Sequence, residues 1–291
     1  MVEEKAYAKI NLLLAVTEKR TDGFHELRTV FQSLALHDTL TFSHNDTEAI
    51  RLSCINSSLP TGPDNLVWRA AKRLQSYYGI KKGVHITLEK QIPVAAGLGG
   101  GSSDAAATLR GLIRFWQLPT ILPPLLQIAA DLGSDIPFCL EGGTALGEGR
   151  GEKLTQLPPC PHFEVVLANP GFGVSTYAIY QGLDPLSFNQ TADLEGMINA
   201  ITARDREGVC ARLHNTLESS TFRLYPAVNA LKTQMGLLTP ALMCGSGPTV
   251  FALLPTVQAA QAVKKVLEQA GMQAWCTQTK NDQVIGGGMR V

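Results

Sequence analysis

The glycine-rich segment at residues 97–101 constrains this chain more than any other feature of its sequence. Four of its five residues are glycine, and it lies between an alternating apolar stretch at 84–88 and an alanine-rich stretch beginning at Ala105. The alternation predicts a half-buried strand, and the alanine-rich stretch predicts a helix. Glycines at such a junction let the backbone approach a polyanion closely, and a helix start adds unpaired amides and the positive end of its dipole. The sequence therefore predicts a phosphate-binding loop, comprising Pro93, Val94, Ala95, Ala96, Gly97, Leu98, Gly99, Gly100, Gly101, Ser102 and Ser103.

The predicted loop has none of the commonest nucleotide-binding patterns. No lysine follows the glycines, as the P-loop requires, and Ser102 occupies the place of the third glycine in the dinucleotide-binding pattern. The catalytic loop and Asp-Phe-Gly segment of protein kinases are absent too. A flexible turn capped by Ser102 and Ser103 is the alternative, but so many glycines at this junction favour a nucleotide site of another kind. The two serines would cap the helix and supply hydroxyl groups for a phosphate oxygen or for Mg²⁺.

The charge balance implies that any phosphate binding must be local. Lys plus Arg and Asp plus Glu each number 25 in 291 residues, so no net field attracts nucleic acid or an anionic membrane. None of the six cysteines falls in a Cys-x-x-Cys pair or a zinc-type cluster, and we expect them to be reduced. The sequence lacks a signal-peptide pattern and any stretch of about 18 apolar residues, so we expect a cytoplasmic protein. We assign no side chain to a metal.

The rest of the chain mixes strand and helix patterns without regular alternation, which favours an α+β fold of two lobes. Asp64 is expected to cap the first helix, and we place the boundary between two domains near Pro158, giving residues 1–157 and 158–291. Strands are expected at 6–16, 27–36, 40–42, 50–54, 84–88, 164–168, 241–244, 250–254 and near 274, and helices at 66–78, 105–116, 122–132, 194–202, 225–235 and 259–270.

Five segments, in order along essentially the whole chain, resemble the galactokinase–homoserine kinase–mevalonate kinase superfamily. They are residues 8–12, 20–25, the glycine-rich loop, 132–138 and 245–249. Together they resemble the branch that phosphorylates a cytidine-diphosphate-linked methylerythritol in the non-mevalonate route to isoprenoids. The resemblance implies ATP with Mg²⁺ as phosphoryl donor, transfer to the 2-hydroxyl of the sugar alcohol, and no nucleic-acid or membrane partner.

The resemblance also implies a fold. The N-terminal lobe would be a ribosomal-protein-S5-domain-2-like lobe with a left-handed β-α-β unit. The C-terminal lobe would be ferredoxin-like, and the active site would lie in the cleft between the two.

Lys9 and Asp135 resemble the catalytic pair of the superfamily. Asp135 would accept the proton of the attacking hydroxyl, and Lys9 would keep it ionised and neutralise charge on the transferred phosphoryl group. Asn11 shares the strand face of Lys9, because side chains repeat every second residue, and would bond the substrate or the pair. The structural alternatives are a lysine that reaches solvent and an aspartate that caps a turn.

Further positions take their expected roles from the same resemblance. Phe24, His25 and Tyr180 would enclose the cytosine, with Phe24 standing where the superfamily branch usually has tyrosine; a surface aromatic and a surface histidine are the alternative. Thr176 would lie near the catalytic pair. Asn65 and Lys90 resemble residues near the adenine, and roles at a helix start and a strand end fit them equally well. We interpret Asp104 as a stabiliser of the first helical turn.

Two other functions compete with this interpretation. One is a related kinase for homoserine, mevalonate or a sugar, which the cytosine-site residues argue against. The other is a homologue that binds ATP without catalysis, which the presence of both Lys9 and Asp135 argues against. No nucleophile with an adjacent activating base is apparent, so we expect direct transfer.

Overall fold

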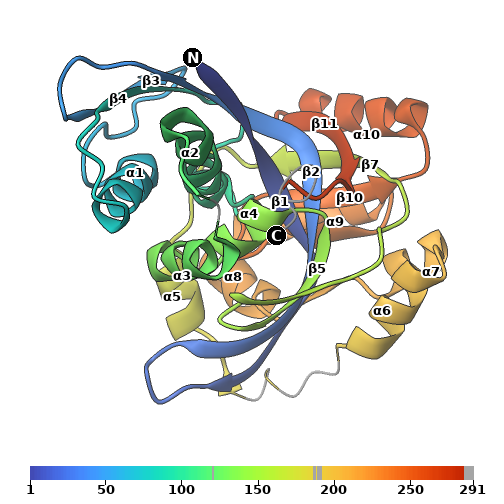
Figure 1. Ribbon diagram of the computed structural model, residues 1–291. Helices are drawn as coiled ribbons and strands as arrows, with labels where there is room; N and C mark the ends of the chain where they lie inside the picture. Colours follow the sequence, from blue (N-terminus) through green and yellow to red (C-terminus); the bar gives the residue numbers. More distant parts are fainter. Residues whose placement is uncertain (120, 186–187, 189–191, 285–291) are drawn as a thin grey trace.

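A long antiparallel hairpin forms the centre of the fold. We describe a computed structural model, which places residues 1–119, 121–185, 188 and 192–284. Strand β1 (Val2–Lys19) and strand β2 (His25–Ser43) run side by side across the molecule (Figure 1). The expected strands at 27–36 and 40–42 are therefore parts of one strand.

The N-terminal lobe is built on this hairpin. Strand β2 pairs with β4 (Val84–Glu89), and β4 pairs in parallel with β3 (Ile50–Ile55), so that α1 (Leu66–Tyr77) connects them as the expected β-α-β unit. Buried apolar side chains of these strands pack against α1 and against α2 (Gly100–Trp116). Helices α3 (Leu122–Leu132) and α4 (Ile136–Glu141) complete the same core.

The cluster of glycines at 142–151, to which the sequence assigned no element, contains one strand and is followed by another. Strand β5 (Thr144–Gly149) pairs with β2, and β6 (Lys153–Gln156) pairs with β5. A Cβ atom on Gly147 would lie 2.6 Å from the ring of Phe31, so the close approach of the backbone to this ring requires glycine.

The C-terminal lobe is an antiparallel sheet covered by helices on both faces. Its strands are β7 (Glu164–Asn169), β9 (Ala241–Met243), β10 (Val250–Leu254) and β11 (Gln273–Lys280). Alternate residues of β7 and β10 face opposite layers, as the two-residue period of a strand requires. One layer contains α6 (Leu194–Thr202) and α7 (Arg206–Ala211), and the other α9 (Pro226–Gly236) and α10 (Val257–Gln269).

The two lobes share one sheet, in the order β3-β4-β2-β11-β7-β10-β9. Strand β11 makes the join, because Thr279 pairs with Leu34 of β2 while Trp275 pairs with Leu167 of β7. The α+β, two-lobed fold predicted from the sequence is confirmed. The boundary near Pro158 stays a prediction, and residues 285–291 of the second predicted domain lie outside the described residues.

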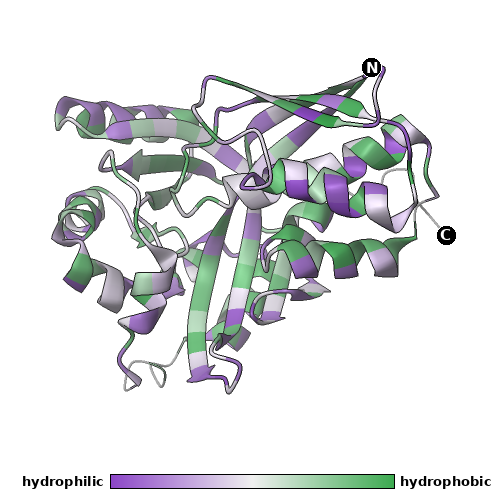
Figure 2. Ribbon diagram, turned by 90° about the vertical axis from the view of Figure 1, so that its left-hand side faces the viewer, coloured by the Kyte–Doolittle hydropathy of each residue, from purple (hydrophilic) through white to green (hydrophobic). Residues whose placement is uncertain are grey.

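Three shorter elements come from the second half of the chain. They are α5 (Thr176–Gln181), β8 (His214–Asn215), which pairs with β1, and α8 (Glu218–Leu224). Hydrophilic and hydrophobic residues are interspersed along the helices in Figure 2, as expected for helices that pack one face against a sheet and expose the other to solvent. None of the helices in the described part of the chain is long and apolar enough to cross a membrane.

Two predictions about helix starts are wrong. Helix α1 is capped by Asn65 rather than Asp64, because the Oδ1 atom of Asn65 accepts a hydrogen bond from the amide of Val67 at 2.9 Å. Helix α2 begins at Gly100, inside the glycine run, and its N-cap residue Gly99 has a φ of 70°. The serines that follow are therefore already helical and do not cap it.

Candidate active site

A single large cavity collects the residues that the sequence singled out. It has a volume of about 1090 Å³ and lies between the glycine-rich loop, β1, β2, the start of α4 and, from the C-terminal lobe, α5 and the glycine turn at 245–247. Every predicted site residue except Ser103 lines it. Ser103 is buried instead, and its hydroxyl donates a hydrogen bond to the backbone oxygen of Tyr7 at 2.6 Å. The size suits two bound substrates, since single ligand pockets measure roughly 300–1,000 Å³.

Close approach of the backbone explains why glycines are needed in the loop. A Cβ atom on Gly97, whose φ is 79°, would lie 2.2 Å from the backbone oxygen of Cys244. A Cβ atom on Gly99 would lie 2.8 Å from the side chain of Lys9. The loop is thereby wedged between β1 and the C-terminal glycine turn. Because α2 starts at Gly100, its first amides have no partners within the helix and are available to an anion in the cavity.

Lys9 and Asp135 form an ion pair in this cavity. The Nζ atom of Lys9 lies 3.0 Å from Oδ2 of Asp135 and 3.0 Å from Oδ1 of Asn11. Asn11 is itself fixed, because its amide donates a hydrogen bond to the hydroxyl of Thr29 at 2.7 Å. The expected strand face shared by Lys9 and Asn11 is thus present. The side chain of Lys9 is only 5% exposed, whereas that of Asp135 is 32% exposed, so the carboxylate is the part of the pair that a ligand reaches.

Local structure places Asp135 at the start of α4. Gly133 ends α3, and Pro137 occupies the first turn of α4, where its missing N–H costs nothing. The side chain of Asp135 makes no capping hydrogen bond to α4. It is therefore directed to Lys9 across the cavity, and this turn brings together two residues 126 positions apart in sequence.

Aromatic side chains line the part of the cavity near the β1–β2 turn. The ring centroids of His25 and Tyr180 are 5.2 Å apart, and the guanidinium of Arg150 lies 5.0 Å from the ring centroid of Phe24. Burial, with a smaller effect of Lys19, lowers the pKa of His25, so its imidazole is neutral at pH 7. Burial raises the pKa of Tyr180 above its usual value. Neutral, flat groups of this kind suit a planar base.

The remaining predicted residues have clear structural partners. Both ends of the Asn65 amide are engaged, because it caps α1 and donates to the backbone oxygen of Pro60 at 2.7 Å. Thr176 lies 2.8 Å, hydroxyl to hydroxyl, from Ser246 in the C-terminal glycine turn. The ammonium of Lys90 forms hydrogen bonds with Asp38 and Asp104.

The interpretation of Asp104 as a first-turn stabiliser is wrong. It is the fifth residue of α2, which has no acidic residue in its first turn, and its buried carboxylate pairs with Lys90. The sequence also gave no role to Arg150, Ser246 or Asp38. Ser246 lies in the segment that resembles the superfamily, which was the available signal. Nothing local distinguishes Asp38, because its partners lie more than 50 residues away.

The cavity provides oxygen ligands that fit a nucleotide-bound Mg²⁺. No group of three or more His, Cys, Asp or Glu side chains among the described residues could hold a metal by itself. Mg²⁺ in kinase sites is held mainly by phosphate oxygens and water, with one or two side-chain oxygens. Ser102 and the part-exposed Asp135 line the cavity and offer such oxygens.

Comparisons with known proteins agree with this geometry. The model of the GHMP kinases N terminal domain matches residues 65–143, and that of the GHMP kinases C terminal domain matches residues 197–272. The chain is 50% identical to the 4-diphosphocytidyl-2-C-methyl-D-erythritol kinase of Moorella thermoacetica over 94% of this chain and 97% of the relative. It is 44% identical to the enzyme of that name from Bacillus subtilis over 97% and 96% of the two chains.

Solved structures show the same relationship. The crystal structure of 4-(cytidine 5'-diphospho)-2C-methyl-D-erythritol kinase superposes with a TM-score of 0.83 at 34% identity, covering 96% of this chain and all of that one. Homoserine kinase from Cytophaga hutchinsonii, at 20% identity and a TM-score of 0.74 over 97% and 96% of the chains, shares the fold.

The chain therefore belongs to the GHMP kinase family, and the relatives that it matches over nearly their whole length are 4-diphosphocytidyl-2-C-methyl-D-erythritol kinases. The resemblance seen in the sequence is confirmed. The protein is a small-molecule kinase with ATP as a substrate.

Proposed function

We propose that this kinase transfers the γ-phosphoryl group of ATP to the 2-hydroxyl of 4-diphosphocytidyl-2-C-methyl-D-erythritol, a step in the non-mevalonate synthesis of isoprenoid precursors. One observation carries the proposal. The Lys9–Asp135 pair, at 3.0 Å, lies in the same cavity as the glycine-rich loop and the aromatic side chains of Phe24, His25 and Tyr180. The phosphoryl donor, the acceptor alcohol and the catalytic base would thus share one cavity. The relatives are named as kinases of this same substrate.

The chemical step follows from the exposure of Asp135. Its carboxylate accepts the proton of the 2-hydroxyl as that oxygen forms a bond to the γ-phosphorus, while the bond from the γ-phosphorus to the β–γ bridging oxygen breaks and ADP leaves. Lys9 orients the carboxylate through their ion pair, and its positive charge offsets the negative charge of the phosphoryl group. Asn11 fixes the ammonium of Lys9 through their 3.0 Å hydrogen bond.

The nucleotide is proposed to bind along the loop at residues 93–103. Backbone amides at the start of α2 face the phosphates, and Ser102 contributes its hydroxyl, whereas Ser103 supports the loop through β1. Bound Mg²⁺, held by Ser102 and by phosphate oxygens, would neutralise charge on the β- and γ-phosphates. Asn65 and Lys90 lie on the side of the loop where the adenine is proposed to bind.

The cytosine is proposed to bind among Phe24, His25 and Tyr180. The half-exposed ring of Phe24 and the partly buried ring of Tyr180 provide flat apolar faces, and the neutral His25 provides one donor and one acceptor for the edge of the base. Phenylalanine at position 24 keeps the stacking face but offers no hydroxyl. Thr176 and Ser246 close the cavity from the C-terminal lobe.

A substrate panel tests the proposal. The purified chain is incubated with ATP, Mg²⁺ and either the cytidyl conjugate, free 2-C-methyl-D-erythritol 4-phosphate, homoserine, mevalonate or galactose. ADP release is measured, and the product is located by phosphorus NMR. We expect turnover with the conjugate alone and a new phosphomonoester on its 2-hydroxyl. Equal turnover with the free phosphate would contradict the cytosine site, and turnover with homoserine or mevalonate only would replace the proposed substrate. No ADP with any acceptor would indicate a homologue that binds ATP without catalysis.

A further inference from the structure

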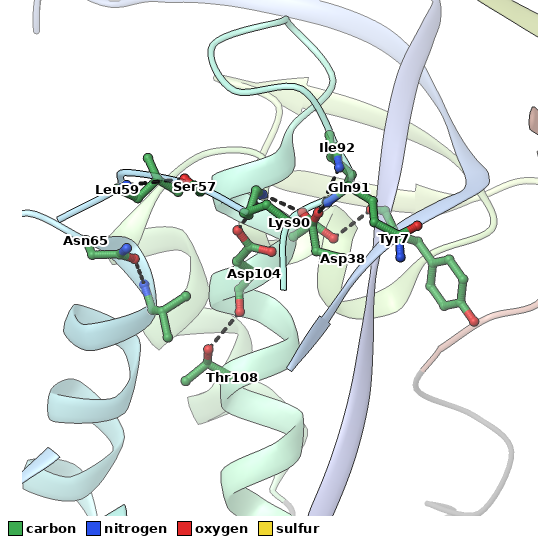
Figure 3. A network of polar contacts seen from close by, with 12 residues as sticks. Tyr7, Asp38, Ser57, Leu59, Asn65, Lys90, Gln91, Ile92, Asp104 and Thr108 are labelled. Atoms are coloured by element: carbon green, nitrogen blue, oxygen red, sulfur yellow. Dashed lines mark hydrogen bonds and ion pairs between the residues drawn. The ribbon is translucent and has the colours of Figure 1, made fainter. Parts of the chain in front are cut away.

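A second charged cluster lies behind the glycine-rich loop, away from Lys9 and Asp135. It consists of Asp38 of β2, Lys90 just after β4, and Asp104 of α2 (Figure 3). The side chains are 0%, 5% and 3% exposed, respectively. Three elements far apart in sequence therefore meet at one buried set of charges. Lys90 and Asp104 border the cavity, but the proposed phosphoryl transfer uses none of the three side chains.

Asp38 holds the entry of the loop directly. Its Oδ1 atom accepts hydrogen bonds from the backbone amides of Gln91, at 2.5 Å, and Ile92, at 2.8 Å (Figure 3). These are the last two residues before the predicted loop begins at Pro93. The side chain thereby acts for this segment as a neighbouring strand would, by satisfying consecutive backbone amides.

The exit of the loop is tied to the same side chain through Lys90. The ammonium of Lys90 donates to Oδ2 of Asp38 and, at 2.9 Å, to Oδ2 of Asp104. Asp104 belongs to α2, whose first residue, Gly100, ends the loop. A Cβ atom on Gly100 would lie only 3.3 Å from the ammonium, so the cluster lies directly beneath the amides that face the cavity.

Stability alone does not explain why three charged side chains are buried here. Moving charges out of water is unfavourable, and well-packed apolar residues in their place often stabilise a protein as much. Two carboxylates also face one ammonium, and Oδ1 of Asp104 has no hydrogen-bond partner. Burial is the largest cause that raises the pKa of Asp104, to about 7.

We propose that Asp38 is a positioning residue for the nucleotide phosphates, because it fixes the entry of the glycine-rich loop directly and the helix start at its exit through Lys90 and Asp104. The inference rests on the proposed use of this loop for ATP. Asp38 touches no substrate. It acts by holding the backbone amides of residues 99–101 in a fixed position relative to the nucleotide phosphates.

Nucleotide binding without an acceptor tests this role separately from the proposed reaction. The full chain and its Asp38→Asn variant are titrated with AMP-PNP and Mg²⁺ by calorimetry, and adenosine affinity is measured by competition. The asparagine keeps the shape and one acceptor oxygen but removes the charge that Lys90 and the two amides share. We expect AMP-PNP affinity to fall by about tenfold or more, as for the loss of charge-assisted hydrogen bonds, and adenosine affinity, to which Lys90 beside the adenine contributes, to fall much less.

Glu4→Gln is the matched control. Glu4 pairs with Arg110, which is also buried and also on α2, but neither residue lines the cavity. This variant should lower the melting temperature without changing AMP-PNP affinity. If Asp38→Asn does not fold, Asp104→Asn takes its place, with a smaller loss of AMP-PNP affinity expected.

Five outcomes decide between the positioning role and its alternatives. Wild-type AMP-PNP affinity in the folded Asp38 variant, or in the Asp104 variant that replaces it, would overturn the inference. Equal loss for AMP-PNP and adenosine, or equal loss in Glu4→Gln, would also overturn it, because a general loosening of the lobe would then suffice. A wild-type chain that binds AMP-PNP but does not phosphorylate the cytidyl conjugate would refute the proposed reaction and leave the positioning role intact. Absence of AMP-PNP binding to the wild type would overturn both.

Discussion

Two lysine–carboxylate clusters flank the glycine-rich loop, and they differ most in how far solvent or a ligand can reach their carboxylates. The lysine side chains are equally buried, each 5% exposed. Asp135, the carboxylate beside Lys9, is 32% exposed, whereas the carboxylates beside Lys90 are 0% and 3% exposed. A buried cation with an accessible carboxylate suits proton transfer to a ligand. A buried cation between enclosed carboxylates holds backbone in place and leaves no group free for chemistry.

The loop contacts each cluster through a different glycine. A Cβ atom on Gly99 would meet the side chain of Lys9, and one on Gly100 would meet Ile92 and the ammonium of Lys90. Substitutions at Gly99 and Gly100 should therefore perturb the two clusters separately. Lysine–aspartate pairs on two sides of one loop therefore serve chemistry or positioning according to whether their carboxylate is exposed to the cavity.

The largest expected effect is on turnover, from Asp135→Asn. The change keeps the shape but removes the proton acceptor, and general-base assistance contributes about 10²–10⁴ in rate, so kcat should fall by that factor. Affinity for ATP and the cytidyl conjugate, measured by calorimetry, should change little. Near-normal turnover would show that the base lies elsewhere, or that the loose transition state of phosphoryl transfer needs none.

Lys90→Met and Lys9→Met should separate stability from chemistry. Removing Lys90 leaves two enclosed carboxylates unpaired, which should lower the free energy of unfolding by about 3–5 kcal/mol. Removing Lys9 leaves a part-exposed carboxylate that water can reach, so the loss should be about 1 kcal/mol or less, with turnover lost instead. Urea denaturation measures the first quantity and a kinase assay the second. Equal destabilisation by both substitutions would break the comparison.

Gly99→Ala and Gly100→Ala should have smaller effects, the first mainly on kcat and the second mainly on the KM for ATP. The first displaces Lys9 at a φ of 70°, and strain there costs on the order of 1–2 kcal/mol, so kcat should fall about tenfold. The second presses on Ile92 and Lys90, so the KM for ATP should rise more than kcat falls. Gly101→Ala is the control, because its Cβ atom would lie at an ordinary 3.6 Å from Leu66. Equal changes in kcat and in the KM for ATP in the first two variants would contradict the assignment of chemistry to the Lys9 cluster and positioning to the Lys90 cluster.

The smallest expected effect is the pH dependence of stability in Asp104→Asn. The folded pKa of Asp104, about 7, lies above the value of 3.8 for a free carboxyl. The stabilisation is therefore fully present below about pH 4 and is lost as the pH rises through about 7. Relative to the asparagine variant, the wild type should lose a few degrees of melting temperature, about 2–4 °C per kcal/mol, between pH 5 and 8.

The groups that act electrostatically on Asp104 are Lys90 and Asp38, and it is also within electrostatic range of the thiols of Cys54 and Cys139. A thermal-melt series at fixed ionic strength gives the difference between wild type and variant. A constant difference across this pH range would show that Asp104 stays ionised.

Local patterns were enough to predict most elements and the outline of the site. The alternation at 84–88 and the apolar period at 122–132 are each short-range signals, and both elements occur where expected. The glycine-rich loop was predictable for the same reason, because its function depends on consecutive residues. The cap of α1 was placed one residue early, since Asp64 and Asn65 are equally good caps by chemistry and only the backbone path decides.

Long-range pairs could not be predicted from local patterns. Asp38 lies among both apolar and polar residues of β2, and its ion-pair partner is a lysine 52 residues further along the chain. Asp104 looked like a helix-start residue because the start of α2 was placed too late. The glycine cluster at 142–151 was not assigned because strands with so many glycines depend on neighbours such as β2 and Phe31 for their existence.

The division of labour between the two clusters is tested most directly by turnover at saturating ATP, with Asp135→Asn and Asp38→Asn compared in one assay with the cytidyl conjugate. Saturation compensates for a weakened nucleotide site but not for a missing base. We predict that the Asp38 variant regains the wild-type rate as ATP is raised, while the Asp135 variant stays slow at every ATP concentration. Full recovery of the Asp135 variant at high ATP, or a persistent deficit of the Asp38 variant, would contradict this account.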